Sequence, residues 1–326
     1  MIIDAHVHLN VLNDDFMGYA VKNNIRLLSV VTDIPMFPNF KDQLDTVLRL
    51  KKRYPDHVDF ACTFPCQNWG QSGWLQQSLE FIQKGMDLGA VGVKVWKNVG
   101  MSIRDASGRY VMMDDPTFDP IFKFLEDNKI VVLSHVGEPK NCWLPLEEMT
   151  VESDKAYFSA HPQYHMFKNP DMPSYYEQLE ARNRVLRNHP NLKFVGLHLA
   201  SLEWNVQKVG EFLDEFPNTM VDLAERICHL QYQAMTEWQK VYDFFIAYQD
   251  RIIYGTDIIV DIDTFKGENV SYILKKYADH RKFFLDTEPM TVPKVSGEFN
   301  GLGLPKEVAQ KIYVDNALKA YPRMKR

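Results

Sequence analysis

The stretch IIDAHVHL, residues 2–9, places two histidines one residue apart in an otherwise apolar run. Residues two apart in a strand lie on the same face, so His6 and His8 share one face of the strand that this run predicts. Two histidines on one face can be metal ligands or hydrogen-bonded core residues, and the run alone does not separate the two. The answer depends on whether other metal-binding side chains recur at matching places further along the chain.

The rest of the chain alternates between short β-branched runs and segments of helical periodicity. Eight strands are predicted, at residues 2–9, 26–32, 58–64, 90–96, 130–136, 193–199, 219–224 and 251–257. Several are near-continuous apolar runs, which is typical of parallel strands buried on both faces. The alternation predicts an α/β fold, a single (β/α)8 TIM barrel domain over residues 1–326. A doubly wound open sheet is the alternative, but it usually has fewer strands, and no G-x-G-x-x-G follows the first strand.

Two connections are longer than ordinary loops. They cover residues 136–173 after strand five and residues 258–304 after strand eight. Long loops in a compact domain are usually functional, so we expect these two to cover the site.

Composition excludes several classes of protein. The net charge is −6, and no block of Lys and Arg resembles a nucleic-acid-binding surface. No apolar run approaches the roughly 18 residues of a membrane span. The first strand begins too early to leave room for a signal peptide, and four cysteines are too few for a disulfide framework. We therefore expect a cytoplasmic protein with reduced thiols and a small-molecule substrate, with the oligomeric state left open.

Polar side chains stand on the first strand and at the ends of several later ones. In a barrel the carboxyl ends of all strands open onto one mouth, where active sites lie. Any one of these residues could be an ordinary core or ion-pairing residue, but a converging set predicts a metal site, because imidazole and carboxylate suit zinc and similar ions. The six candidate ligands are His6, His8, Lys94, His135, His198 and Asp257.

Five motifs on these strands resemble those of the amidohydrolase superfamily. They are DAHVH (4–8), GVKVW (92–96), LSHVGEP (133–139), GLHLA (196–200) and YGTD (254–257). The tail GLGLPKEVAQKIYVDNALKAY (301–321) also resembles the closing helix of one branch, the amidohydrolase-2 branch. That branch contains metal-dependent hydrolases, lactonases and decarboxylases similar to amino-carboxymuconate-semialdehyde decarboxylase.

The resemblance implies a role for each candidate ligand. His6, His8, His135 and Asp257 would hold one metal, which we expect to be zinc. His198 would bind a second metal or act as an acid toward the substrate, and Lys94 would bridge two metals if its amine is carboxylated. We expect one ion rather than two.

Two reactions fit this set of residues. In a hydrolase of amides, esters or lactones, zinc lowers the pKa of its water to about 7, Asp257 takes the water's proton, and His198 polarises the substrate or protonates the leaving group. In a non-oxidative decarboxylase, the same ligands serve a lyase reaction. A barrel that binds a ligand without turnover is a third reading, against which the complete ligand set argues.

Substrate contacts are predicted from two strand ends. Strand seven reads TMVDLAER (219–226), and the alternation directs Asp222 and Ala224 to the barrel axis and Arg226 over the mouth. A guanidinium suits a carboxylate, so we expect Arg226 to hold an acidic substrate, with Lys97 as a helper and Trp96 as a wall. The alternative for Arg226 is an ion pair with Glu225 or another loop acid.

Overall fold

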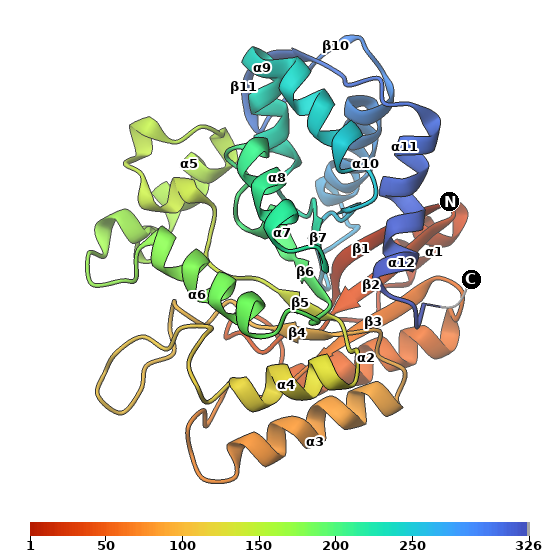
Figure 1. The fold of residues 1–326 in the computed structure, drawn as a ribbon. Coiled ribbons are helices and arrows are strands. Elements are labelled where there is room, and N and C mark those ends of the chain that lie inside the picture. Colours follow the sequence, from red (N-terminus) through yellow and green to blue (C-terminus); the bar gives the residue numbers. More distant parts are fainter. Residues whose placement is uncertain (325–326) are drawn as a thin grey trace.

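A single sheet of parallel strands forms the centre of the structure, a computed structural model that describes residues 1–324 (Figure 1). The strand order β8-β7-β6-β5-β4-β3-β2-β1-β9 follows the chain. The strands are β1 (Ile2–Leu9), β2 (Ile25–Val30), β3 (Val58–Thr63), β4 (Val93–Val95), β5 (Val132–Ser134), β6 (Phe194–Gly196), β7 (Thr219–Asp222), β8 (Ile252–Ile253) and β9 (Ile258–Val260). Residues 325 and 326, which the predicted domain includes, lie outside the described residues.

The sheet closes on itself through the eighth predicted strand, which is interrupted in the middle. Within it, β8 pairs with β7, and β9, which begins at Ile258 just beyond the predicted end at residue 257, pairs with β1. Between them, the Ala5 amide donates to Tyr254 O at 3.0 Å and the Asp257 amide donates to His6 O at 2.8 Å. The predicted (β/α)8 barrel is therefore confirmed, and its closure places Asp257 beside His6.

Helices surround the sheet (Figure 1). They are α1 (Asp14–Lys22), α2 (Phe40–Arg53), α3 (Trp74–Asp87), α4 (Asp119–Asp127), α6 (Tyr175–Asn188), α8 (Val206–Glu215), α9 (Ile227–Ala247), α10 (Glu268–Leu285), α11 (Lys306–Gln310) and α12 (Asn316–Ala320). Local sequence fixes their ends: Asn39 caps α2, and Ser174 with Glu177 forms a capping box on α6. Their apolar faces pack on buried strand residues such as Val93 and Val132.

Several strands are shorter than the sequence predicts. The sixth ends at Gly196 rather than at residue 199, because the chain turns there into α7 (Leu197–Ala200), in which His198 and Leu199 have left-handed backbone angles. A side chain on Gly196 would place its Cβ 2.6 Å from Ala200 Cβ, so only glycine fits under this turn. His198 therefore projects from a turn and not from a strand.

Both long connections contain secondary structure. The one after β5 holds α5 (Glu152–Ala160) and four short 3₁₀ turns around a small apolar core of Cys142, Met149, Phe158 and Met166. The one after β8 holds β9, α10 and a hairpin of β10 (Pro289–Val292) and β11 (Val295–Asn300). The Glu152 amide donates to Lys294 O at 2.9 Å, which joins the two connections. Their role as a cover stays a prediction.

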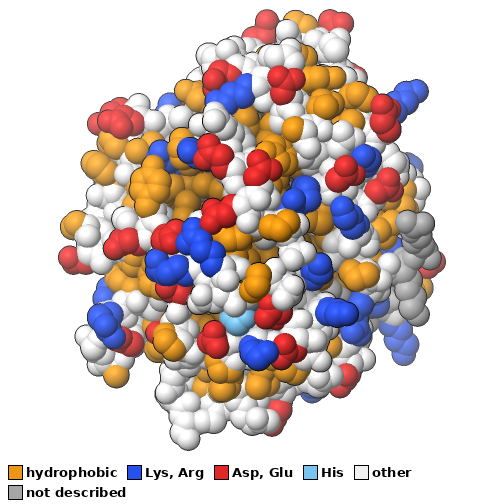
Figure 2. All heavy atoms as spheres, in the orientation of Figure 1, with side chains coloured by type: hydrophobic (Ala, Val, Ile, Leu, Met, Phe, Trp, Pro, Cys, Tyr) orange, Lys and Arg blue, Asp and Glu red, His pale blue; other side chains and the backbone are white. Residues whose placement is uncertain are grey.

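The surface is mixed in charge on the face that Figure 2 draws, where Lys and Arg are interspersed with Asp and Glu. No helix within residues 1–324 is both long and apolar enough to cross a membrane.

Candidate metal centre

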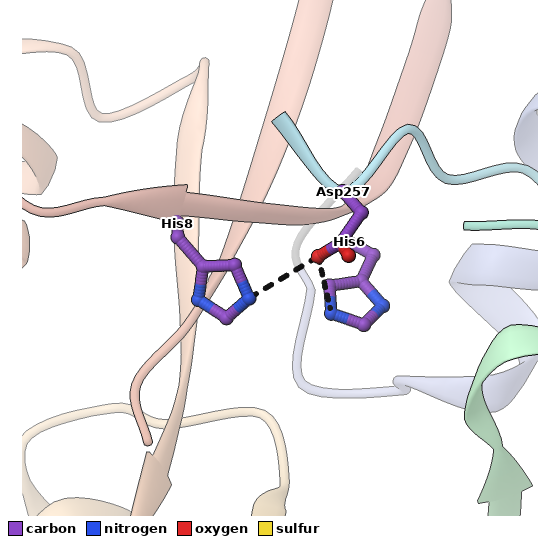
Figure 3. Close-up of side chains that lie close together, drawn as sticks. All are labelled: His6, His8 and Asp257. Carbon is purple, nitrogen blue, oxygen red and sulfur yellow. Dashed lines mark ion pairs between the residues drawn. The ribbon is translucent and has the colours of Figure 1, made fainter. Parts of the chain in front are cut away.

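His6, His8 and Asp257 form the centre of the barrel mouth. Each offers a ligand atom, and these atoms all lie within 4.8 Å of one another. The Nε2 atoms of His6 and His8 are each 3.3 Å from Asp257 Oδ1. Figure 3 shows both rings, which come from β1, directed at the carboxylate of Asp257, which comes from the segment after β8. Three of the six predicted ligands therefore converge as expected from their strand positions.

Asp222, at the end of β7, holds the His6 ring from behind. Its Oδ2 lies 2.7 Å from His6 Nδ1, and its Oδ1 accepts the His198 amide at 2.5 Å. Burial raises the pKa of Asp222, but His6 and His198 outweigh it and hold the pKa below the ordinary value. An ionised Asp222 makes Nδ1 the protonated nitrogen of His6, so the Nε2 lone pair faces Asp257.

His135 and His198 lie ring to ring beside this group. Their ring centroids are 4.1 Å apart, and the His198 ring is 5.0 Å from that of His6. His135 is not part of the close group of three, but its Nε2 is buried with no hydrogen-bond partner in the part of the chain described. Burial, together with the neighbouring His198, lowers the pKa of His135 well below its ordinary value. It is therefore a neutral ring that can serve as a ligand.

His198 is also neutral and has a defined tautomer. Burial lowers its pKa to about 3. Its Nδ1 lies 2.8 Å from Ala224 O, and since a carbonyl only accepts, Nδ1 carries the proton. Only a lone pair remains at Nε2, which can bind a metal or accept a proton. The predicted role as an acid requires that His198 first take up a proton.

Lys94, on β4, is 3% exposed at the same mouth. Burial lowers the pKa of its amine to about 7, although Asp257 and Asp222 raise it. An amine with that pKa is partly neutral at pH 7, and a neutral amine is the form that can be carboxylated. Whether Lys94 bridges two metals stays a prediction.

The two predicted substrate contacts after β4 differ in position. Lys97 Nζ lies 2.8 Å from Glu138 Oε1, and Glu138 raises the pKa of Lys97. Trp96 is fully buried, and its indole donates to Phe64 O at 2.7 Å. Its ring packs on Phe64 and Phe118 in the core. Trp96 therefore supports the barrel wall from within and is not part of the substrate site that we propose below.

Arg226 is 7% exposed and precedes α9. Its Nη1 donates to the Glu225 backbone O at 3.3 Å, and its Nε is buried without a partner among the described residues. The Glu225 carboxylate instead binds Lys276 Nζ at 2.5 Å and Lys294 Nζ. The alternative of an Arg226–Glu225 ion pair is therefore not what the structure has.

The residues at the mouth fit a divalent metal. His6 Nε2 is buried with no hydrogen-bond partner within the described chain, and its other nitrogen is used by Asp222. Imidazole nitrogens and one carboxylate are the donors that zinc and manganese accept. Two residues of the site were not predicted from the sequence: Asp222, for which only the inward position was expected, and Phe37. The Phe37 ring lies 4.7 Å from the His8 ring, and a lone loop phenylalanine carries no sequence signal.

Comparison with known proteins agrees with this geometry. A family model described as Amidohydrolase matches residues 3–323. No curated protein matches the chain at a significant level.

Solved structures with the same fold belong to proteins named for different reactions. A dihydroxybenzoic acid decarboxylase from Polaromonas sp. JS666 with bound manganese has a TM-score of 0.53 and 13% identity, over 97% of this chain and 87% of its own. The 4-oxalomesaconate hydratase of Rhodopseudomonas palustris has a TM-score of 0.53 and 15% identity, over 99% and 96%. A probable 2-pyrone-4,6-dicarboxylic acid hydrolase from Acinetobacter baumannii has a TM-score of 0.52 and 12% identity, over 98% and 99%. At these identities the likeness shows the shared barrel fold.

Proposed function

The chain belongs to the amidohydrolase family, and from this premise we propose a metal-dependent hydrolase that cleaves an amide, ester or lactone bond in a small substrate carrying a carboxylate. The observation that carries the proposal is the group of His6, His8 and Asp257, whose ligand atoms lie within 4.8 Å of one another. These three residues, with His135, would hold one divalent metal, which we propose is zinc. Such a metal supplies Lewis acidity, which makes water nucleophilic at neutral pH and polarises a carbonyl oxygen.

Asp257 and His198 would handle different protons of the reaction. The ring nitrogens of His6 and His8 both approach Asp257 Oδ1, which leaves Oδ2 to accept a hydrogen bond from water. His198 has a lone pair at Nε2, so it accepts a proton before it can donate one to a leaving group. Asp222 keeps both histidine-bearing segments in place through its two oxygens.

Arg226 would orient the substrate. A buried guanidinium with an unused Nε is a strong site for a carboxylate, because the charge is already desolvated and the donors are fixed. Lys97 is committed to Glu138 at 2.8 Å and can assist only by exchanging that partner. This arrangement favours a small organic acid over a neutral substrate.

A decarboxylase is the second candidate. Decarboxylation replaces the departing CO₂ with a proton on carbon, so His198, which has a lone pair at Nε2, would first take up a proton and then deliver it to that carbon, while Arg226 would hold a carboxylate of the substrate. Metal-replete protein should be screened against lactones, amides and esters of small acids, and in parallel against aromatic and unsaturated acids with detection of CO₂. Ring opening or hydrolysis supports the hydrolase, CO₂ release supports the lyase, and neither product would overturn both.

The role of Arg226 is tested with the best acid substrate found. Arg226→Ala should lower kcat/KM by roughly 100-fold, since a bidentate charged contact is worth about 3 kcal/mol, while metal content stays at the wild-type value. Arg226→Lys should recover only part of the loss, because lysine lacks the planar fork. Arg187→Ala, at an exposed arginine of α6, is the matched control and should be silent. Unchanged kinetics in Arg226→Ala would reject a carboxylate contact.

A further inference from the structure

Glu203, in the segment after α7, is a buried carboxylate that lacks a cation. The residue is 1% exposed. Its Oε1 accepts the Lys140 amide at 2.8 Å, and its Oε2 is buried with no hydrogen-bond partner among the described residues. The ammonium of Lys140 does not neutralise it, because that group lies over the Trp204 ring, 3.6 Å from the centroid. An unpaired buried carboxylate oxygen is costly to maintain.

Arg226 is the cation that Glu203 affects electrostatically, yet the two side chains do not form an ion pair. Glu203 is the largest favourable electrostatic influence on the guanidinium, and it raises the pKa of Arg226 against the lowering effect of burial. No ion pair joins Arg226 to any carboxylate of residues 1–324, and its Nε, like Glu203 Oε2, is buried and unused. A buried donor and a buried acceptor are thus both left without partners among the described residues.

His229 borders the same region. It is 2% exposed, its Nε2 lies 3.3 Å from Asp154 Oδ2, and neither ring nitrogen forms a hydrogen bond within the described chain. Gln233 fixes its distance from Glu203, because the Gln233 amide donates to Glu203 O at 2.8 Å and to His229 O at 3.1 Å. His198 Nδ1 donates to Ala224 O at 2.8 Å, two residues before Arg226, so this region adjoins the candidate metal centre.

Buried polar groups in native proteins almost always have partners, and exceptions call for an explanation such as a ligand. We propose that Glu203, Arg226 and His229 form a subsite that binds a substrate carrying a hydroxyl group together with its carboxylate. The carboxylate accepts from Arg226, and the hydroxyl donates to Glu203 Oε2. This inference rests on the proposed function, in which Arg226 holds the carboxylate, and adds Glu203 as the residue that selects the hydroxyl.

The test uses two small acids that differ by one hydroxyl, succinate and malate, as probes of metal-replete protein in calorimetric titration. The wild-type protein should bind malate roughly 10- to 100-fold more tightly than succinate, since a hydrogen bond to a charged acceptor has that effect. Glu203→Gln keeps the side-chain shape and an acceptor for the Lys140 amide, but removes the charged oxygen. This variant should reduce the preference to about threefold or less, with succinate affinity unchanged.

A matched control is Glu211→Gln, at an exposed glutamate of α8, which should keep the full preference. Equal affinity of the wild-type protein for the two acids would overturn the inference without any variant, as would a preference that persists in Glu203→Gln. If succinate binding is lost in Arg226→Ala while no malate preference exists, the carboxylate contact stands and only the hydroxyl subsite falls. If neither acid binds, or Arg226→Ala binds both normally, both proposals fall. If Glu203 and Arg226 only hold a water molecule between them, malate and succinate should bind equally, which is the result that overturns the hydroxyl subsite.

Discussion

Replacement of Asp222 by Asn tests how much the candidate metal centre depends on a residue that holds its histidines but is not itself a ligand. Asp222 is 1% exposed and accepts two hydrogen bonds, from His6 Nδ1 at 2.7 Å and from the His198 amide at 2.5 Å. Asparagine offers one carbonyl oxygen and one NH₂ group. If the Asn oxygen keeps the His198 amide, the NH₂ group faces His6 Nδ1, and His6 must then carry its proton on Nε2, the nitrogen that would bind the metal.

The magnitude follows from these two bonds. A hydrogen bond to a charged acceptor contributes about 1.5–3 kcal/mol and one between neutral groups about 0.5–1.5 kcal/mol, so loss of the anion weakens both bonds. We expect Asp222→Asn to lower the free energy of unfolding of the metal-free protein by about 2–4 kcal/mol. A His6 ring no longer held by an anion should also bind metal roughly 10- to 100-fold more weakly.

The assay measures metal dissociation constants at pH 7 by competition with a chelator, together with urea unfolding. Asp59→Asn is the control: Asp59 is also 1% exposed and also accepts charged hydrogen bonds, from Arg26 at 2.6 Å and Lys51 at 2.8 Å, but it contacts no candidate ligand. It should lose stability and keep its metal affinity. Metal affinity of Asp222→Asn within twofold of wild type, or an equal loss in Asp59→Asn, would refute the argument.

Three further predictions address the ligands and the fold. Replacing His6 and His8 together with Ala should abolish metal binding in elemental analysis, and full occupancy would remove the assignment. Wild-type protein and Lys94→Ala should both hold one equivalent of metal; two equivalents in the wild type, with one lost in the variant, would contradict the single-ion proposal. Burial lowers the pKa of His280 to about 3, below about 6.5 for an unfolded histidine, so stability from the neutral ring is complete above pH 6.5 and is lost as the pH falls toward 3. His280→Gln, which can still bond Tyr254, should lose about 2–3 kcal/mol less than wild type between pH 7 and pH 4.5 in urea unfolding of metal-free protein; identical pH profiles would contradict this.

Strand positions could be predicted from short-range patterns in the sequence, and the convergence of three ligands could be predicted from the order of strands in a barrel. Alternation along β1 placed His6 and His8 on one face, and the order of the strands placed Asp257 beside them. The same alternation directed Asp222 inward, but its role depends on a hydrogen bond to a residue 216 positions away, which no local pattern encodes. The orientation of Trp96 was equally hidden, because position at a strand end does not reveal that the indole turns into the core toward Phe64.

The backbone conformation of the barrel mouth could not be predicted from the sequence, and it determines the shape of the site. Ten non-glycine residues of the described chain have positive φ, and six of them lie at this end of the barrel: His198, Leu199, Ala200, Ser201, Glu225 and Asp257. Each left-handed L-residue costs roughly 1–2 kcal/mol, so such residues persist only where other contacts determine the conformation.

Those contacts come from outside the metal centre. Arg182 and Tyr175, both buried on α6, donate to the carbonyl oxygens of Ala200 and Ser201, and the Ser201 hydroxyl donates to Val136 O at 2.6 Å. The last of these bonds ties the turn that carries His198 to the residue following His135. The left-handed backbone conformations at the mouth are unfavourable, and buried hydrogen bonds from α6 offset their cost. Leu197, Leu199 and Ala200 of this turn belong to the hydrophobic core, and the same backbone conformation places the His198 ring beside those of His135 and His6.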